Sequence, residues 1–242
     1  MKPLQHDLVV LFDHDGTVVD SETIALESAW RLTDEVAQEF PGAQHYELNE
    51  FVKSFAGKPY REILQKIYAD SLTTLNERDI DALVAEEEKR AIERLSIEAK
   101  ATEGTPEVLS YLRDGKVEYA LVSNSSLQRL SACLSSAALT DYFPSEQIFS
   151  AHDSLPVARP KPLPDIYLYA VKCLEAEVSL CVAVEDSISG VRAAVAAGIG
   201  QIIGYVGGTH VSEDERTSRA DALVSAGAQQ VIERMHDLIG LL

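Results

Sequence analysis

Residues 8–17 have the sequence LVVLFDHDGT, a short apolar run that ends in two aspartates one residue apart. A continuous apolar run of this length is typical of a strand buried on both faces of a parallel sheet. In open α/β sheets, ligands bind beyond the carboxyl ends of the strands, which is where Asp13 and Asp15 lie. Side chains at positions i and i+2 of an extended chain point the same way. The two carboxylates can therefore converge on one substrate or cation, and Gly16 lets the backbone turn sharply after them.

Asp13 and Asp15 repel each other unless a cation lies between them or one of them holds a proton. A hard, oxygen-binding cation such as Mg2+ is a suitable partner. With the cation in place, one carboxylate can act as a nucleophile and the other can transfer protons. Because Asp and Gly are also ordinary turn residues, this segment alone is explained equally well by a strand–turn junction without chemistry.

The composition of the 242-residue chain narrows the classes of protein. A hydrophobic fraction of 46% is enough for a folded core, and a formal charge of −18 argues against nucleic acid or an anionic membrane as the main partner. Cys133, Cys173 and Cys181 lie far apart without metal-ligand spacing, which favours free thiols in a reducing compartment. We find neither a signal peptide nor an apolar run of membrane-spanning length, so we expect a cytoplasmic protein.

Amphipathic segments follow the first strand. They begin at about Ser21, Pro59 and Asn76, and no strand-like apolar run separates them. The simplest account is an all-helical domain over residues 19–98.

Beyond Gly104 the pattern alternates between strands and helices, which is typical of a doubly wound parallel sheet. The expected strands are 119–123, 147–150, 181–185, 201–205 and 222–224, and the expected helices are 105–112, 127–137, 164–174, 189–197 and 228–241. A lone strand ahead of a helical domain has no pairing partner, so the first strand must join this sheet. We therefore predict an α/β fold in which residues 1–18 and 99–242 form one Rossmann-like core.

Two loops of the expected core offer groups that can bind an anion. Ser123 and Asn124 end a strand and precede a helix N-terminus, where a hydroxyl and an amide can hold an anion. Capping of that helix by the serines that follow is the plainer explanation. Lys161 lies among prolines that stiffen its loop, and an ammonium held in one place suits a phosphate group. An exposed loop lysine is the alternative.

Glu185 and Asp186 form a second acidic pair at the end of a buried strand. Burying carboxylates without a partner is costly, so a structural explanation of this pair is difficult. A metal ion shared with Asp13 and Asp15 would remove that cost.

Taken together, these motifs resemble one family. Asp13-x-Asp15-Gly16-Thr17, Ser123-Asn124, Lys161-Pro162 and Glu185-Asp186-Ser187-x-x-Gly190 stand in the order and at the strand ends expected of the haloacid dehalogenase superfamily. The helical insertion after the first motif is similar to the cap of the subgroup that includes β-phosphoglucomutase and many sugar-phosphate phosphatases. The resemblance covers nearly the whole chain.

The resemblance implies a role for each residue of the motifs. Asp13 would attack phosphorus and become an aspartyl-phosphate, and Asp15 would protonate the leaving oxygen and then activate water. Mg2+ would be held by Asp13, the backbone carbonyl of Asp15 and Asp186, with Glu185 in or just behind its ligand shell. The phosphoryl oxygens would be bound by Thr17, Ser123, Asn124 and Lys161.

The implied reaction is hydrolysis of a small phosphorylated metabolite, such as a sugar phosphate or a related acid. A β-phosphoglucomutase-type phosphomutase is the alternative, because both activities use the same motifs. The ending Gly16-Thr17 favours the phosphatases slightly. We expect no nucleic-acid or membrane partner, and a monomer or weak homodimer.

Three residues of the helical domain, Gly57, Lys58 and Arg61, resemble the cap loop that faces the leaving group in this subgroup. A turn with solvated charges followed by the start of a helix explains them equally well. The sequence assigns no role to His14 or to residues 207–210.

Overall fold

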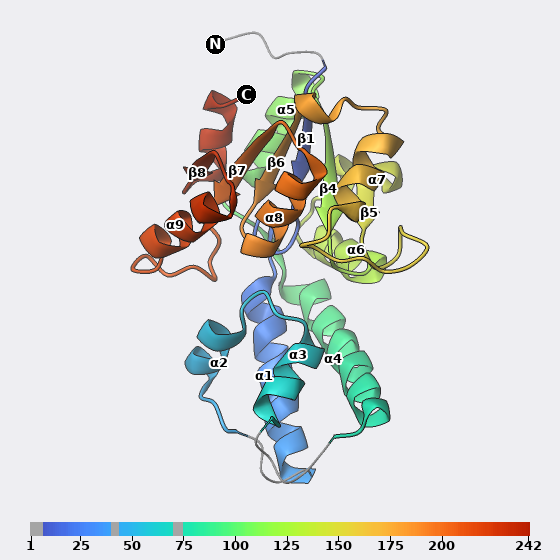
Figure 1. Cartoon of the computed structure of the whole chain (residues 1–242), viewed down its shortest axis with the longest axis vertical. Helices are drawn as coiled ribbons and strands as arrows, with labels where there is room; N and C mark the ends of the chain where they lie inside the picture. The colour runs from blue at the N-terminus through green and yellow to red at the C-terminus, as the bar shows by residue number, and fades with distance from the viewer. Residues whose placement is uncertain (1–6, 40–43, 70–74) are drawn as a thin grey trace. The chain divides into compact units, whose positions relative to one another are not determined.

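The computed structural model describes residues 7–39, 44–69 and 75–242. The chain divides into two compact units, one formed by Met1–Asp20 with Lys100–Leu242 and the other by Ser21–Ala99 (Figure 1). We refer to the first as the core unit and to the second as the cap unit.

The core unit is built on a six-stranded parallel sheet among the residues that the structure describes. The strand order is β5 (Ile148–Ser150), β4 (Glu118–Ser123), β1 (Val9–Phe12), β6 (Cys181–Glu185), β7 (Gln201–Tyr205) and β8 (Gln230–Ile232). The first strand is central: Phe12 aligns with Leu121 of β4 on one side and with Val184 of β6 on the other. The chain thus winds outward in both directions from β1, which confirms the predicted doubly wound sheet.

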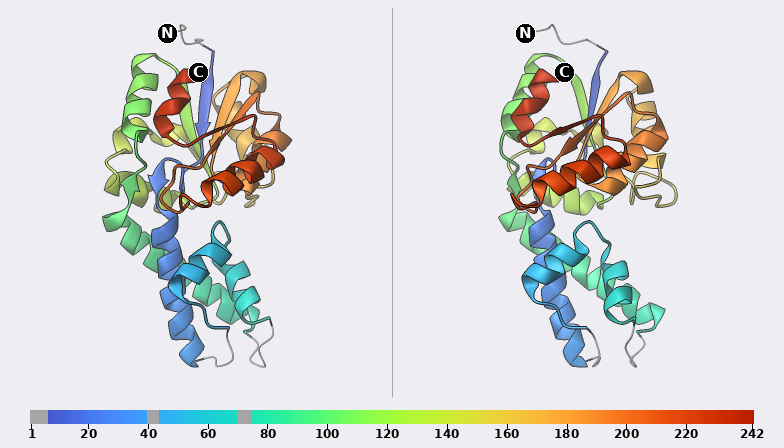
Figure 2. Two further views of the ribbon diagram at one scale, coloured as in Figure 1. Left: turned by 90° about the vertical axis from the view of Figure 1, so that its left-hand side faces the viewer. Right: turned by 60° about the vertical axis from the view of Figure 1, so that its left-hand side comes forward.

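Helices cover both faces of this sheet, as Figure 2 shows. The core-unit helices are α5 (Thr105–Asp114), α6 (Leu127–Ser136), α7 (Asp165–Cys173), α8 (Ile188–Ala197) and α9 (Arg216–Ala226), with a 3-10 segment at Met235–Gly240. One face of β1, carrying Val9 and Leu11, packs in a buried cluster with residues of α7 and α8. All four residues of β1 are buried, as a two-sided apolar strand requires.

Two predictions near the end of the chain are wrong. Residues 222–224 lie inside α9 rather than in a strand, and residues 228–241 contain β8 and the 3-10 segment rather than one helix. Short apolar runs cannot be assigned to strand or helix by periodicity alone. Here Gly227, with φ 124°, ends α9, and the chain then pairs with β7, where Ile203 aligns with Gln230.

The cap unit is helical in its described residues. Its helices are α1 (Glu22–Glu39), α2 (Leu48–Phe55), α3 (Tyr60–Ile67) and α4 (Glu77–Glu98). The sequence pattern missed α2, although Phe51 and Phe55 are fully buried and contact the ring of Tyr46. The Asn76 side chain caps α4 by accepting the Asp79 N–H at 3.0 Å.

A short antiparallel ladder in the core unit pairs the segment before the cap unit with the segment after it. Residues Val19–Asp20 (β2) pair antiparallel with Lys100–Ala101 (β3). The Thr102 hydroxyl donates to the Thr17 carbonyl at 2.6 Å, which ties the returning chain to the loop after β1. Two residues per strand are too few to leave an apolar signature in the sequence.

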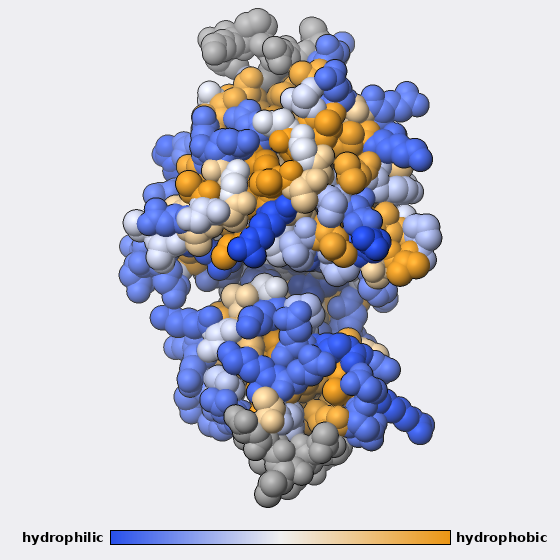
Figure 3. Space-filling view, viewed as in Figure 1, coloured by the Kyte–Doolittle hydropathy of each residue, from blue (hydrophilic) through white to orange (hydrophobic). Residues whose placement is uncertain are grey.

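Hydrophobic residues are exposed at several places on the core unit. Figure 3 shows them in groups beside polar residues on one face of that unit. Exposed examples are Leu168 of α7, Val195 of α8 and Val224 of α9. Among the described helices, none has both the length and the apolar character needed to cross a membrane.

Candidate active site

Parallel pairing brings three of the sequence motifs to one edge of the sheet. Asp13 follows β1 directly, and its N–H donates to the Val184 carbonyl of β6 at 2.9 Å. Ser123 is the last residue of β4 and Glu185 is the last of β6, the strands on either side of β1. All three side chains are buried. Residues more than a hundred positions apart in the chain therefore converge at the carboxyl ends of neighbouring strands.

Lys161 is the centre of this convergence. Its ammonium donates at 2.6 Å each to Asp13 Oδ1, to Glu185 Oε1 and to the Val122 carbonyl. The side chain is only 3% exposed, so this is a buried ion pair and not the solvated loop lysine that was the alternative. Asn124 fixes the loop, because its Oδ1 accepts the Lys161 N–H at 2.7 Å. In this structure Asn124 thus holds the backbone of Lys161.

Electrostatics at the cluster are dominated by burial. Burial raises the pKa of Asp13 and of Glu185, and the Lys161 ammonium offsets this only in part. The charge of Asp186 adds to the upward shift of both carboxyls. Burial opposes the charge of Lys161, but the two carboxylates bound to it raise its pKa above the ordinary value. One ammonium therefore faces more negative charge than it can neutralise.

The residues of this cluster fit a divalent cation. Asp13, Glu185 and Asp186 each offer one ligand atom, and these atoms lie within 4.8 Å of one another. Glu185 Oε2 is buried and has no hydrogen-bond partner among the described residues. Carboxylate oxygens are the ligands that Mg2+ prefers, and a cation would compensate the charge that Lys161 leaves. The side chain of Asp15, also a predicted ligand residue, is not part of this group.

Asp15 is held by residues of the segment that follows β4. The Ser125 hydroxyl donates to its Oδ2 at 2.6 Å, and Arg129 Nη2 of α6 donates to its Oδ1 at 3.1 Å. Burial raises the pKa of Asp15, but Arg129, His14 and Ser125 together bring it well below the usual range. Sequence reasoning missed Arg129. Arg129 lies in the first turn of α6, and no pattern in the sequence marks it as part of the site.

His14 and the loop at 207–210, to which the sequence assigned no role, both lie at the site. His14 is fully buried, with Nδ1 3.4 Å from Asp15 Oδ2. His210 Nε2 lies 3.0 Å from Asp186 Oδ2, although the two residues come from different loops. The Thr17 hydroxyl is buried without a hydrogen-bond partner in the described part of the chain, so it is available to a bound group.

Two glycines let the backbone approach the carboxylates closely. A Cβ on Gly16 would lie 2.5 Å from Asp186 Oδ2, and the residue also has φ +80°. A Cβ on Gly190 of α8 would lie 1.7 Å from Glu185 Oε2. Glu185 is thus packed directly against the helix backbone, which leaves its carboxylate little freedom to move.

Gly190→Ala should therefore displace the Glu185 carboxylate and destabilise the core unit. Overpacking of this kind costs about 1–3 kcal/mol of unfolding free energy. Chemical denaturation of the wild type and of Gly190→Ala measures the difference in unfolding free energy. Gly240→Ala is the matched control, because a Cβ at that exposed glycine meets no atom within 4 Å. Equal stability of the two variants would show that the Glu185 side chain can move aside freely.

The three cap-unit residues named from the sequence lie where α2 gives way to α3. The Gly57 N–H donates to Glu22 Oε1 at 2.6 Å, and Lys58 is exposed. Arg61, in the first turn of α3, forms ion pairs with Glu77 and with Asp81. The charge of Arg61 is thus compensated inside the cap unit. The local structure is a turn followed by the start of a helix, one of the two explanations that the sequence left equal.

Comparisons with known proteins agree with this fold and this set of motifs. The family model for haloacid dehalogenase-like hydrolases matches residues 8–198. The chain is 29% identical to a phosphorylated carbohydrates phosphatase of Thermotoga maritima, over 93% of each chain. A crystal structure of a haloacid dehalogenase-like protein of unknown function from Agrobacterium tumefaciens superposes with a TM-score of 0.79, at 33% identity over 96% of each chain. A HAD family hydrolase from Deinococcus radiodurans, crystallised with bound phosphate and sodium, gives 0.72 at 29% identity over 97% of this chain and 94% of that one.

The fold and the matched motifs thus define a hydrolase with an α/β core and an inserted helical unit. The chain belongs to the haloacid dehalogenase-like hydrolase family, and within that family it is a hydrolase of the phosphatase type. The resemblance inferred from the motifs is confirmed.

Proposed function

We propose that this protein is a Mg2+-dependent phosphatase that hydrolyses a small phosphorylated metabolite, a sugar phosphate or a related phospho-acid, through an aspartyl-phosphate on Asp13. The observation that carries the proposal is the buried Lys161 ammonium bound to Asp13 and Glu185, beside Asp186. Two relatives support it: one is named for phosphorylated carbohydrates and another holds phosphate. The proposal assigns residues 1–18 and 99–242 to the catalytic domain and residues 19–98 to the cap.

Each step of the proposed reaction uses a residue of the cluster. An Asp13 oxygen attacks phosphorus, and the bond from phosphorus to the leaving oxygen breaks. Arg129, His14 and Ser125 hold the pKa of Asp15 low without substrate, but the negative charge of a bound phosphoryl group raises it, and Asp15 then gives the leaving oxygen a proton. It then takes a proton from the water that attacks the aspartyl-phosphate, which releases inorganic phosphate and restores Asp13. Mg2+, when bound by Asp13, Asp186 and the Asp15 carbonyl with Glu185 behind or among them, would neutralise charge on the transferring group.

The transferring phosphoryl group needs donors that are not already satisfied. Lys161 can exchange one of its three hydrogen bonds for a phosphoryl oxygen, and the Thr17 hydroxyl has no partner to lose. Ser123, whose hydroxyl accepts the Ser125 N–H at 3.1 Å, keeps its own proton to donate. Asn124 contributes by holding the Lys161 backbone. In the cap, Gly57, Lys58 and Arg61 are proposed as substrate-contacting residues.

A panel of phosphorylated metabolites with Mg2+ at neutral pH tests the proposal. We expect release of inorganic phosphate from one or more sugar phosphates, and inhibition by fluoroberyllate with Mg2+ because it mimics a phosphoryl group on an aspartate. Isomerisation of glucose 1-phosphate without phosphate release would instead identify a phosphomutase. Indifference to fluoroberyllate would contradict the covalent intermediate.

Arg129→Met should discriminate between substrates by their leaving groups. Arg129 holds Asp15 in place and also lowers its pKa. Its loss raises that pKa, but a carboxyl that is no longer held in position should protonate the leaving oxygen poorly. We expect kcat/KM for alkyl phosphates to fall about 100-fold, because general acid catalysis contributes on that order. p-Nitrophenyl phosphate, whose leaving group needs no proton, should change little. Arg192→Met, on the exposed side of α8, is the control, and equal losses on both substrates would argue against this role of Arg129.

Mg2+ should stabilise the protein more at pH 7.5 than at pH 5. Burial raises the pKa of Asp13 and Glu185, so the metal-free folded state takes up protons that the unfolded state does not hold. The stability that these two carboxyl groups give the metal-free protein therefore decreases as the pH rises above their pKa values in the unfolded state. Protons also compete with Mg2+ for the same carboxylates, so Mg2+ binds better at the higher pH. At a Mg2+ concentration 100 times Kd, binding adds about 2.7 kcal/mol. Thermal unfolding with and without Mg2+ at both pH values measures the effect, and a pH-independent difference would contradict it.

A further inference from the structure

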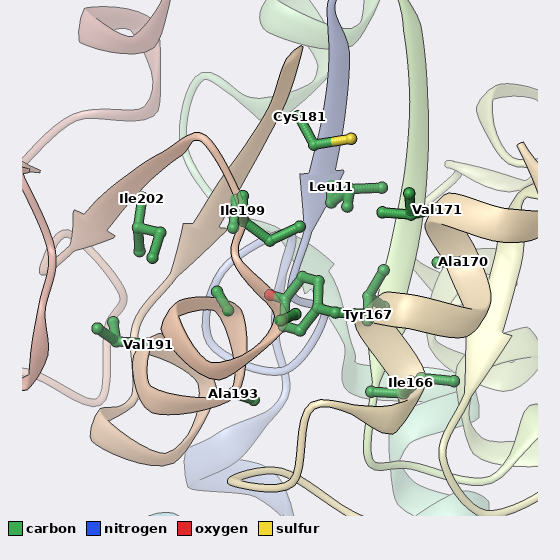
Figure 4. Packing of buried hydrophobic residues seen from close by; sticks show 14 of the residues in the cluster. Leu11, Ile166, Tyr167, Ala170, Val171, Cys181, Val191, Ala193, Ile199 and Ile202 are labelled. Atoms are coloured by element: carbon green, nitrogen blue, oxygen red, sulfur yellow. The ribbon is translucent and has the colours of Figure 1, made fainter. Parts of the chain in front are cut away.

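Tyr167 reaches the acidic cluster from outside the sequence motifs. It lies on α7 and is fully buried, and Figure 4 shows its ring projecting from that helix into the hydrophobic cluster. Its hydroxyl donates a short hydrogen bond to Glu185 Oε1. Lys161 Nζ donates to the same oxygen at 2.6 Å. An aromatic residue on an apolar helix face predicts only core packing, so this contact could not be expected from the sequence pattern.

The two carboxylate oxygens of Glu185 have different contacts. Oε1 accepts from Tyr167 and Lys161, whereas Oε2 is buried and has no hydrogen-bond partner among the described residues. The backbone of Gly190 packs against the carboxylate, closest to Oε2, and so limits the directions from which a partner can reach that oxygen. A carboxylate fixed through one oxygen and confined by backbone presents its second oxygen in one direction only. That oxygen is the one left for a further partner.

Lys161 cannot hold Glu185 alone throughout the proposed reaction. Its three donors are taken by Asp13, Glu185 and the Val122 carbonyl, so a phosphoryl oxygen must replace one of them. If the ammonium turns from Glu185 to the phosphoryl group, the Tyr167 hydroxyl is the donor that remains on Oε1. The hydroxyl thus supports Glu185 independently of Lys161.

We infer that Tyr167 is a positioning residue: by anchoring Glu185 Oε1, it keeps Oε2 available to the cation or to its bound water and frees Lys161 for the phosphoryl group. The inference rests on the proposed function, because it concerns the same cation. Residues that hydrogen-bond to metal-binding carboxylates orient them, and their loss weakens metal binding about 10- to 100-fold.

Tyr167→Phe isolates the hydroxyl. The variant keeps the ring, whose centroid lies 5.2 Å from Lys161 Nζ, and therefore keeps the packing and the cation–π contact. Tyr205→Phe is the matched control, because Tyr205 is equally buried in the core unit and lies outside the carboxylate cluster. Circular dichroism and thermal unfolding establish that both variants are folded.

Calorimetric titration of the whole protein with Mg2+ tests the inference. We expect the Kd for Mg2+ to rise about tenfold in Tyr167→Phe and to stay within twofold of wild type in Tyr205→Phe. In a Glu185→Gln background, Tyr167→Phe should add less than a twofold further change, because the two residues act through one hydrogen bond. Full additivity of the two substitutions would overturn the inference.

The remaining outcomes separate the inference from the proposed function. If wild type binds Mg2+ and Tyr167→Phe binds it equally well, Tyr167 is a packing residue and the proposed function is unaffected. If both tyrosine variants lose affinity alike, the effect is one of general packing and the inference fails. If wild type does not bind Mg2+ at all, the proposed function fails and the inference fails with it.

Discussion

Asp13→Asn should reduce kcat by more than about 10⁴-fold, because loss of a covalent nucleophile costs on that order even when the rest of a site is intact. The amide has the shape of the carboxylate but cannot accept a phosphoryl group. A continuous assay of phosphate release under substrate saturation measures the loss. Asp114→Asn, which removes an exposed charge at the end of α5, should leave kcat unchanged.

The same variant should keep the fold. Burial together with the charges of Glu185 and Asp186 raises the pKa of Asp13, which means that its charge is unfavourable in the metal-free protein at neutral pH. We therefore expect Asp13→Asn to unfold at the same temperature as wild type or a higher one. Retention of more than a tenth of the activity would eliminate Asp13 as the nucleophile, and a lower unfolding temperature would contradict the electrostatic argument.

Lys161→Met should be costly to both stability and activity. Removing the ammonium leaves Asp13 and Glu185 buried without their cation, and breaking a buried ion pair in this way costs about 3–5 kcal/mol. Catalysis should fall about 10²- to 10³-fold, since a donor to the transferring group is lost. Denaturant unfolding without metal and kcat/KM with Mg2+ measure the two effects. Lys172→Met, an exposed lysine of α7, serves as the control.

A second substitution separates the two consequences of losing Lys161. Adding Glu185→Gln to Lys161→Met removes one uncompensated charge, so it should recover part of the lost stability while leaving activity low. Recovery of activity together with stability would show that Lys161 acts only as a structural counter-ion. That result would show that Lys161 does not bind the phosphoryl group.

The core architecture was accessible from sequence because it depends on local patterns. Val9–Phe12 is apolar at every position, as a strand buried on both faces must be, and the alternation of strands and helices after Gly104 limits the fold to a wound sheet. Prediction failed where the local signal is weak. The segment 228–241 carries no period that separates an edge strand followed by a 3-10 turn from a helix, and only pairing with β7 decides it.

The amino-acid sequence by itself determined that Asp13, Glu185 and Asp186 stand at strand ends and that Lys161 lies in a proline-rich loop. It did so because a parallel sheet places all its carboxyl ends at one edge. Only the tertiary structure decided how those groups are partnered. Contacts such as Arg129 on Asp15, His210 on Asp186 and Tyr167 on Glu185 join segments with no fixed spacing in the chain. Their distances come from the packing of helices and loops on the sheet, and no local periodicity encodes that packing.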